Sequence, residues 1–324
     1  MIEVRELKKS YNDIAAVKGV SFTIDRGEIF GFLGPNGAGK TTTISMLCTL
    51  LIPTGGRATV NGFDVVKNKL AVRKSIGLVF QDPSLDERLT ALENLIFHAM
   101  IYGIGKADRD RRIPDVLELV ELSGRQNDLV KTFSGGMKRR LEIARGLLHR
   151  PKVLFLDEPT LGLDPQTRYH IWEYVQQLIE DEGLTIFLTT HYMDEAENCD
   201  RIAIIDDGEL IAMNTPEELK ESIGGEVVLI VAEDNRKASL EIKDKFNIAV
   251  QEVNGELSLK VANGSHFMPE LIKALETTVI SISLRKPTLE DVFLDLTGRR
   301  IRDEKVEGMD QARVRMRARR GRTR

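Results

Sequence analysis

The sequence predicts an α/β fold with a largely parallel sheet at its core. Four short runs are almost entirely apolar, as strands buried on both faces of a parallel sheet are. They are Glu28–Leu33, Ser75–Phe80, Val153–Leu156 and Thr185–Thr189. Segments with helical patterning separate these runs, and an alternation of strand and helix is typical of a parallel α/β core.

The predicted helices of this core occupy the stretches between its strands. A helix is expected over Lys40–Leu51, where Pro53 and a pair of glycines end it. Residues 90–125 are mainly helical in pattern, and Met137–His149 and Arg168–Glu180 predict two more helices. The core should therefore carry a substantial helical layer.

Further β-type segments predict an antiparallel part attached to the core. Met1–Val4 and Ala16–Ile24 have strand patterning near the beginning of the chain. Arg201–Ile205 and Glu209–Met213 flank Asp207-Gly208, a dipeptide typical of hairpin turns.

The chain after Gly224-Gly225 predicts a second, smaller α+β unit. Its pattern is strand, helix, strand, strand, helix, strand, which is the order of the ferredoxin-like unit. A last helix is expected over Leu289–Leu296, with Thr288 as its cap. We therefore expect a first domain over residues 1–222, an accessory or regulatory domain over 226–298 and a basic tail over 303–324.

Composition limits the classes of function. The formal net charge is −4, yet Arg313 to Arg324 holds seven arginines and no acid, so the rest of the chain is more acidic than the total. An acidic body disfavours a general nucleic-acid binder. The tail has the charge to contact anionic headgroups or to remain solvated, and both readings stay open.

Apolar runs and cysteines indicate the cellular environment of this chain. No run approaches the roughly 18 to 20 apolar residues that span a bilayer, so another polypeptide would supply any membrane spans. Cys48 and Cys199 lie far apart without CxxC spacing, which indicates a reducing compartment and neither a disulfide framework nor a zinc site.

A phosphate-binding motif follows the first buried strand. It fits G-x-x-x-x-G-K-[ST] and opens a helix, as phosphate binding requires. Its residues are Gly34, Pro35, Asn36, Gly37, Ala38, Gly39, Lys40 and Thr41, with Thr42 next to them. The glycines let successive backbone amides point at phosphate oxygens, and the helix N-terminus adds the positive end of its dipole. Lys40 is expected to bind the β- and γ-phosphates of ATP, and the Thr41 hydroxyl to bind Mg²⁺.

The apolar run VLFL is followed directly by two acids, Asp157 and Glu158. This strand is expected to lie next to the phosphate-binding motif. In P-loop nucleoside triphosphatases (NTPases), an aspartate at such a strand end holds the water shell of Mg²⁺, and Asp157 fits that role. Glu158 would then lie beside the γ-phosphate and act as the general base that orients the attacking water. The alternative is a pair of helix-capping acids on a loop.

The order of the remaining motifs resembles an ATP-binding-cassette (ABC) ATPase over residues 1–220. These motifs are Ser134-Gly135-Gly136 before an Arg-rich helix, then LFLDEP, then Leu161-Gly162-Leu163-Asp164, then Thr190-His191. Gln81 resembles the Q-loop residue of that family. Tyr11 lies where the family places an aromatic residue under the adenine, although a tyrosine at a strand edge would look the same.

The resemblance implies a role for each of these residues. Gln81 would touch the metal or the attacking water and sense a membrane partner through the Gln81–Glu93 region, which could equally be a solvated helical surface. His191 would contact the γ-phosphate, and Asp164 would bridge two copies of the chain. Ser134, Gly135 and Gly136 would close over the nucleotide held by a second copy.

Physical reasoning supports the last of these roles. Ser134-Gly135-Gly136 offers unpaired amides and a positive dipole end, although the same triplet is common at ordinary helix starts. One chain already has a phosphate cradle, so a second anion site makes sense if it serves the ATP of another subunit.

Details of the motifs resemble the drug-resistance exporters of the daunorubicin type. The signature reads Phe133-Ser134-Gly135-Gly136-Met137, where many relatives have Leu first and Gln last, and Met137 lacks the hydrogen bonds of Gln. The FSGGM form and PTLEDVFLDLTGR at Pro287–Arg299 carry the resemblance. It implies an export ATPase at the cytoplasmic face of the membrane, acting as a homodimer on a separate ABC-2-like permease.

Two alternatives share part of the motif set. One is an ABC ATPase that acts on ribosomes or nucleic acid, and the other is a small-molecule kinase with a P-loop. An ABC ATPase acting on ribosomes would usually carry two cassettes in one chain. One acting on DNA would insert a long coiled coil, and none is present here. In a small-molecule kinase, Ser134-Gly135-Gly136, Asp164 and His191 would lack a purpose. No nucleic acid is therefore expected as a partner.

Overall fold

The computed structural model describes residues 1–12, 14–81, 84–253 and 255–298. Its largest sheet has six strands in the order β10-β9-β3-β8-β7-β6. Neighbours in this sheet are parallel, except that β10 pairs antiparallel with β9. The strands are β3 (Ile29–Leu33), β6 (Ile76–Val79), β7 (Val153–Asp157), β8 (Thr185–Thr190), β9 (Arg201–Asp206) and β10 (Glu209–Asn214). The predicted parallel core is confirmed.

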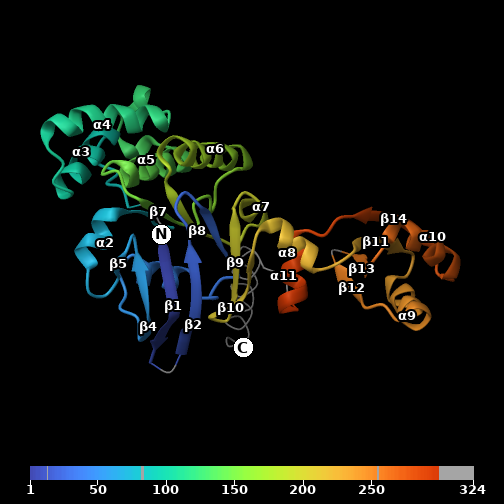
Figure 1. The fold of residues 1–324 in the computed structure, drawn as a ribbon. Coiled ribbons are helices and arrows are strands. Elements are labelled where there is room, and N and C mark those ends of the chain that lie inside the picture. Colours follow the sequence, from blue (N-terminus) through green and yellow to red (C-terminus); the bar gives the residue numbers. More distant parts are fainter. Residues whose placement is uncertain (13, 82–83, 254, 299–324) are drawn as a thin grey trace, which may run out of the picture.

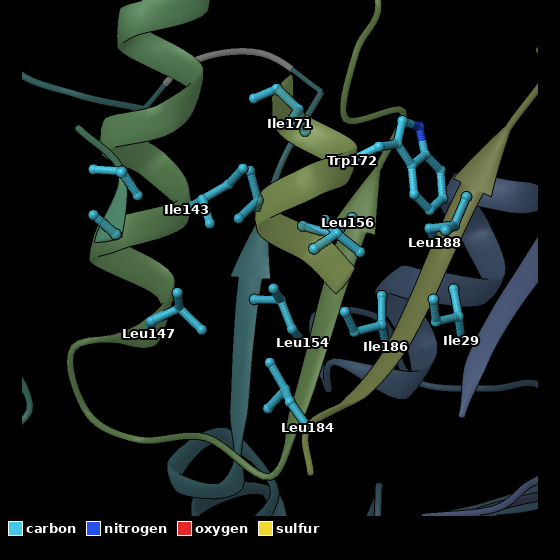
Figure 2. Packing of buried hydrophobic residues seen from close by; sticks show 14 of the residues in the cluster. Ile29, Ile143, Leu147, Leu154, Leu156, Ile171, Trp172, Leu184, Ile186 and Leu188 are labelled. Atoms are coloured by element: carbon cyan, nitrogen blue, oxygen red, sulfur yellow. The ribbon is translucent and has the colours of Figure 1, made fainter. Parts of the chain in front are cut away.

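Both faces of this sheet are covered, which explains why its strands are apolar throughout. Side chains alternate along a strand, so each strand supplies both cores. Phe30, Phe155 and Phe187 face one core, where Phe30 and Phe187 lie 5.8 Å apart between ring centroids. Leu156 and Leu188 face the other, and Figure 2 shows them beneath the helical layer.

A four-stranded antiparallel sheet packs on the phenylalanine side of the core. Its order is β2-β1-β4-β5 (Figure 1, blue). It consists of β1 (Ile2–Tyr11), β2 (Ile14–Ile24), β4 (Gly55–Val60) and β5 (Phe63–Asp64), with α1 (Lys40–Leu47) and α2 (Lys69–Ser75) nearby in the chain. The antiparallel part is confirmed, but the Gly55-Gly56 pair that was expected only to end a helix opens β4. The helix expected over Lys40–Leu51 ends at Leu47, and Thr49 takes a left-handed φ of 64°.

Helices cover the opposite face of the parallel sheet (Figure 1, green). They are α3 (Ala91–Ile101), α4 (Lys106–Leu119), α5 (Gly135–Leu147), α6 (Pro165–Glu182) and the short α7 (Met193–Ala196), with 3₁₀ turns at Ser123–Arg125 and Val130–Thr132. The helix α5 begins two residues before the predicted Met137, because the Ser134 side chain caps it.

The C-terminal unit has the predicted ferredoxin-like order. Its strands pair antiparallel in the order β12-β13-β11-β14 and enclose a core of their own with two helices. The elements are β11 (Glu226–Ala232), α9 (Asn235–Phe246), β12 (Val250–Val253), β13 (Glu256–Val261), α10 (Gly264–Ala274) and β14 (Val279–Arg285).

The last helix returns to the first unit. In α11 (Leu289–Thr297), Leu289, Val292 and Phe293 are buried in the core that lies under the helical layer. There α11 packs beside α8 (Pro216–Ser222), as Figure 1 shows. The domain limits at 222, 226 and 298 remain predictions, and the tail over 303–324 lies outside the described residues.

Candidate functional site

The phosphate-binding motif forms a tight loop between β3 and α1. A Cβ atom on Gly34 would lie 2.3 Å from the Ile205 carbonyl oxygen, and one on Gly39 would lie 2.6 Å from that of Ala16. Gly39 also has a φ of 103°. Only glycine fits these two positions, because the backbone of neighbouring strands approaches the loop closely.

This loop borders a cavity of about 260 Å³. The cavity brings together eight predicted residues, and Ala16 is an unpredicted ninth. The predicted residues that line it are Asn36, Gly37, Gly39, Lys40, Thr41, Thr42, Gln81 and Glu158. Gly34, Pro35 and Ala38 shape the loop without lining the cavity.

Lys40 places a buried ammonium at the base of the cavity. Its side chain is 4% exposed, and Nζ donates to the carbonyl oxygens of Gly34 at 2.8 Å and Pro35 at 3.1 Å. Nζ also lies 3.3 Å from Oε1 of Glu158. A cation held in this way suits the phosphates of a nucleotide.

Thr41 lines the cavity, whereas the buried Asp157 lies beside Thr41 and outside the cavity lining. The Thr41 hydroxyl lies 3.3 Å from Oδ1 of Asp157, and the Thr189 hydroxyl donates to the same oxygen at 2.5 Å. Burial raises the pKa of Asp157 against the opposing effect of these two hydroxyls. A hydroxyl beside a buried carboxylate is a donor set that fits Mg²⁺.

Glu158 sits at the turn that leaves β7. Its φ of 47° is left-handed, and its amide bonds the Thr189 carbonyl oxygen and hydroxyl, both at 3.1 Å. Burial acts to raise the pKa of Glu158, but the hydrogen bond from His191 and the charge of Lys40 bring it below the ordinary value. Glu158 is therefore held in the ionised, carboxylate form.

His191 and Gln81 follow the two strands that flank β7, the strand that ends before Glu158. His191 follows β8 and is buried, with Nδ1 3.4 Å from Oε1 of Glu158. Gln81 follows β6, is exposed and lines the cavity. The carboxyl ends of parallel strands thus bring these side chains together, as the topology requires.

The Ser134-Gly135-Gly136 triplet lies outside this cavity. Ser134 is exposed and caps α5 by accepting from the Met137 amide at 3.3 Å. A Cβ atom on Gly136 would lie 2.4 Å from Cγ2 of Thr167, whereas one on Gly135 would meet only Leu163, at 3.6 Å. The N-terminus of α5 therefore faces solvent, beside the start of α6.

Asp164 and Tyr11 also lie outside the cavity lining. Asp164 accepts from the amide and the hydroxyl of Thr167 at 3.0 and 2.7 Å, and these bonds lower its pKa. Tyr11 ends β1 and is 44% exposed, with Nζ of Lys9 lying 5.2 Å from its ring centroid. Their roles toward a second copy and toward adenine stay predictions.

The sequence did not indicate the buried residues that hydrogen-bond the site residues and the backbone of their loops. Thr189 binds both acids, and Thr160 donates to the buried Glu195. Two charges of α5, Arg139 and Glu142, are buried behind the loops that carry Gln81 and Glu158. The paired threonines that end TIFLTT and the acid inside KRRLEIAR were the available signals.

The fold and the cavity define a P-loop ATPase of the ATP-binding-cassette class. Comparison with known proteins agrees. The family model "ABC transporter" matches residues 17–161, and the model "ATP-binding protein DrrA1-3-like, C-terminal domain" matches residues 215–297.

Relatives match along nearly the whole chain. The linearmycin resistance ATP-binding protein LnrL of Bacillus subtilis (strain 168) is 41% identical over 312 residues, which cover 94% of this chain and 100% of that protein. The daunorubicin/doxorubicin resistance ATP-binding protein DrrA of Streptomyces peucetius is 40% identical over 314 residues, covering 94% of this chain and 95% of DrrA. A solved dimeric cassette, MJ0796 bound to ADP and Pi, matches 66% of this chain and 98% of its own with a TM-score of 0.62 and 30% identity.

The chain therefore belongs to the ATP-binding subunits of ABC transporters, in the daunorubicin-resistance branch of that family. It binds and hydrolyses ATP. No helix among the residues that the structure describes has the length and apolar character to cross a membrane.

Proposed function

We propose that this chain is the motor of an exporter and works as a pair of copies with ATP between them. The observation that carries the proposal is the separation of two helix N-termini, each of which carries motif residues. Lys40 opens α1 inside the cavity, whereas Ser134 caps α5 in solvent and lines no part of that cavity. The second helix end serves the nucleotide of a facing copy.

The dimeric cassette of known structure supports this arrangement. MJ0796 is described as dimeric in a post-hydrolysis state with ADP and Pi. Two copies of this chain would form two equivalent sites, each with Lys40 from one copy and Ser134, Gly135 and Gly136 from the other. ATP stabilises the closed pair because both copies contact the nucleotide only when they are together.

The residues around Asp157 fit a magnesium-bound triphosphate. When bound, Mg²⁺ would supply positive charge that offsets the negative charge of the phosphates. The Thr41 hydroxyl and the Asp157 carboxylate would hold it, with Gln81 at the open side of the cavity. Burial of Asp157 favours a cation as its partner, since a buried carboxylate is costly without one.

Hydrolysis in this proposal depends on Glu158. Its carboxylate orients a water molecule toward the γ-phosphate and accepts a proton from it. Lys40 binds the phosphates, and His191 contacts the γ-phosphate from the adjacent strand end. The distances from Glu158 to Lys40 and His191, 3.3 and 3.4 Å, support a shared site for the three.

An apolar surface next to Gln81 supports docking of a membrane permease at the cytoplasmic face. Leu50, Phe80 and Tyr102 border a cavity of about 380 Å³. Phe97, Met100 and Ile101 on α3 are each at least 60% exposed. An exposed apolar patch of this kind marks an interaction site. We assign the partner to the ABC-2-like permeases, the type that the daunorubicin-branch resemblance implies.

The names of relatives support export as the direction of transport. They include resistance to linearmycin and to daunorubicin or doxorubicin, and a Nod factor export protein of Cupriavidus pinatubonensis that is 39% identical over 308 residues. The substrate class proposed for this transporter is accordingly a drug or a lipid-like compound.

The Glu158→Gln variant tests the proposal. It removes the base and keeps the shape of the side chain, so ATP binding should persist while the rate of hydrolysis falls by about 10² to 10⁴-fold. ATP that is not hydrolysed should hold the copies together. We expect a dimer by light scattering with Mg²⁺-ATP and a monomer without it. Glu233→Gln, an exposed acid of the C-terminal unit, is the matched control and should keep the wild-type rate.

A second substitution in the same background separates dimer closure from nucleotide binding. The monomer has room for a side chain at Gly135, and an acid suits the first turn of a helix. Gly135→Asp should therefore fold and bind ATP, but its carboxylate would repel the phosphates of the facing copy. Glu158→Gln with Gly135→Asp should stay monomeric in ATP. A dimer in that double variant, or wild-type hydrolysis in Glu158→Gln alone, contradicts the proposal.

A further inference from the structure

A buried arginine lies behind the site and bonds the backbone on both sides of Glu158. Arg139 on α5 is 6% exposed. Its Nη2 donates to the Asp157 carbonyl oxygen at 3.1 Å, and its Nε donates to the Pro159 carbonyl oxygen at 2.6 Å. The same guanidinium donates through Nη1 to the carbonyl oxygen of Phe80, the residue before Gln81.

Glu142, one turn further along α5, holds this guanidinium in place. It is fully buried, and its Oε2 lies 3.3 Å from Nη1 of Arg139. Its other oxygen accepts from the Ser84 amide at 2.7 Å. Arg145 bonds the Ser84 carbonyl oxygen at 2.9 Å. Phe80 and Ser84, which flank the Gln81 segment on its two sides, are thus both attached to α5.

Stability alone does not account for a buried ion pair at this place. Burying two charges is costly, and well-packed apolar side chains of similar size are often as stable or more so. The guanidinium has five donors in a rigid planar fork, so it can bond three carbonyl groups through three different nitrogen atoms, whereas all the donors of an ammonium are on one nitrogen atom. Glu158 has a left-handed backbone, a conformation that persists only where neighbouring groups fix it.

We propose that Arg139 and Glu142 are positioning residues that couple the Gln81 loop, the Glu158 loop and the helix that begins with Gly135. A displacement of α5 or of the Gln81 loop then moves Glu158 relative to the γ-phosphate. The inference rests on the roles proposed above for Gln81 and Glu158. Arg139 acts only through the backbone and lines no part of the cavity.

Two substitutions of Arg139 separate its charge from its geometry. Arg139→Lys keeps a charge for Glu142 but not the three carbonyl bonds, and Arg139→Met removes both. We expect kcat for ATP hydrolysis to fall about 10- to 100-fold in each, because small displacements of a catalytic group have large effects on rate. ATP affinity, measured by calorimetry, should stay within about 3-fold of the wild type, since Lys40 and its loop are untouched.

Arg201→Met is a control for the loss of an ion pair away from the site, here a partly buried one. Arg201 bonds Glu28 at 2.6 Å and the Thr23 carbonyl oxygen at 2.8 Å, so it also combines a salt bridge with a backbone contact. It touches neither loop of the site. This variant should lose thermal stability and keep kcat, whereas Arg139→Lys should lose kcat at an assay temperature well below its melting temperature, where it is fully folded.

A double-mutant cycle tests the coupling itself. Gln81→Ala and Arg139→Met should be non-additive in kcat, with Arg139→Met costing less in the Gln81→Ala background, because both act on one connected unit. Additive effects overturn the coupling. A wild-type kcat in Arg139→Lys, with Glu158→Gln inactive, overturns the positioning role alone. An active Glu158→Gln overturns the proposed base and this inference with it.

Discussion

Glu158 occupies the centre of the site at the scale of single residues. One carboxylate oxygen lies 3.3 Å from Nζ of Lys40 and 3.4 Å from Nδ1 of His191, and all three side chains are buried. The charge of Lys40 and the bond from His191 offset the burial that would otherwise protonate Glu158. The carboxylate therefore stays ionised at neutral pH, which is the form that the proposed base requires.

Glu195, four residues after His191, has the opposite character. It is 1% exposed and accepts a hydrogen bond from Thr160. Burial raises the pKa of Glu195 to about 7, against the opposing effects of Thr190 and Arg168. Its folded-state pKa lies above its ordinary value of 4.5, so the proton it binds stabilises the fold at low pH. That contribution is lost as the pH rises through about 7.

The Glu195→Gln variant should consequently change the pH dependence of stability. A glutamine has no proton to lose, so the variant escapes the cost of a buried carboxylate in alkaline solution. We expect its melting temperature, relative to the wild type, to be higher at about pH 8.5 than at about pH 5. Melting curves over this range test the idea. A difference that is constant with pH would show that Glu195 ionises normally in the fold.

Motif residues were predictable from the sequence where the conformation of the backbone requires a particular residue type. Gly34 and Gly39 could be assigned because their spacing with Lys40 matches what a phosphate loop needs. Arg139 and Thr160 could not, since an arginine in a basic helix or a threonine in a loop reads as an ordinary surface residue. The packing of α5 behind β7 shows what Arg139 contacts, and the position of α7 shows that Thr160 bonds Glu195.

The strands of the core were predictable as elements because burial on two faces makes them apolar throughout. β3, β7 and β8 fall within one residue of their expected limits. β4 was missed, since Gly55-Gly56 has no strand pattern and the partners of β4 in β1 lie 47 to 58 positions earlier in the chain. Helix ends were displaced where caps decide them, as at Ser134 of α5.

The helix α11 is attached to both units of the chain. Its apolar side is buried in the first unit, while Arg285 at the end of β14 forms a two-pronged ion pair with Asp291. Burial acts to raise the pKa of Asp291, but Arg285 and Thr288 bring it below the ordinary value of 3.8. The stability this pair contributes is therefore present above pH 3.8 and lost as the pH falls through the lowered pKa.

Asp291→Asn should lower the free energy of unfolding by about 1 to 3 kcal/mol at neutral pH, the range for hydrogen bonds to charged groups. The difference from the wild type should shrink in acid, because Asp291 of the unfolded chain becomes protonated below about pH 3.8 while its folded-state pKa is lower. Urea titrations at about pH 7 and about pH 3 measure both values. Asp295→Asn, a half-exposed acid of the same helix, should cost less than 1 kcal/mol. Equal effects of the two variants would contradict the role given to Asp291.

At the scale of the whole molecule, the proposed function gives the chain two half-sites for nucleotide, one at Lys40 and one at Ser134. The cavity at Lys40 opens to solvent, and the Ser134 helix end lies outside it. The ferredoxin-like unit is connected at two points, through residues 223–225 and 286–288, because α11 returns to the first unit. The class of protein was predictable from motif order, whereas this double connection followed only from the position of α11.

The account depends on ATP lying between Lys40 of one copy and Ser134 of another. The most direct measurement is the structure of the Glu158→Gln variant with Mg²⁺-ATP, solved by crystallography or cryo-EM. We predict that the Ser134 hydroxyl of the facing copy lies within hydrogen-bonding distance, about 3 Å, of a γ-phosphate oxygen. ATP bound at Lys40 with every Ser134 more than about 10 Å from its γ-phosphate would contradict the account, since no hydrogen bond spans that distance.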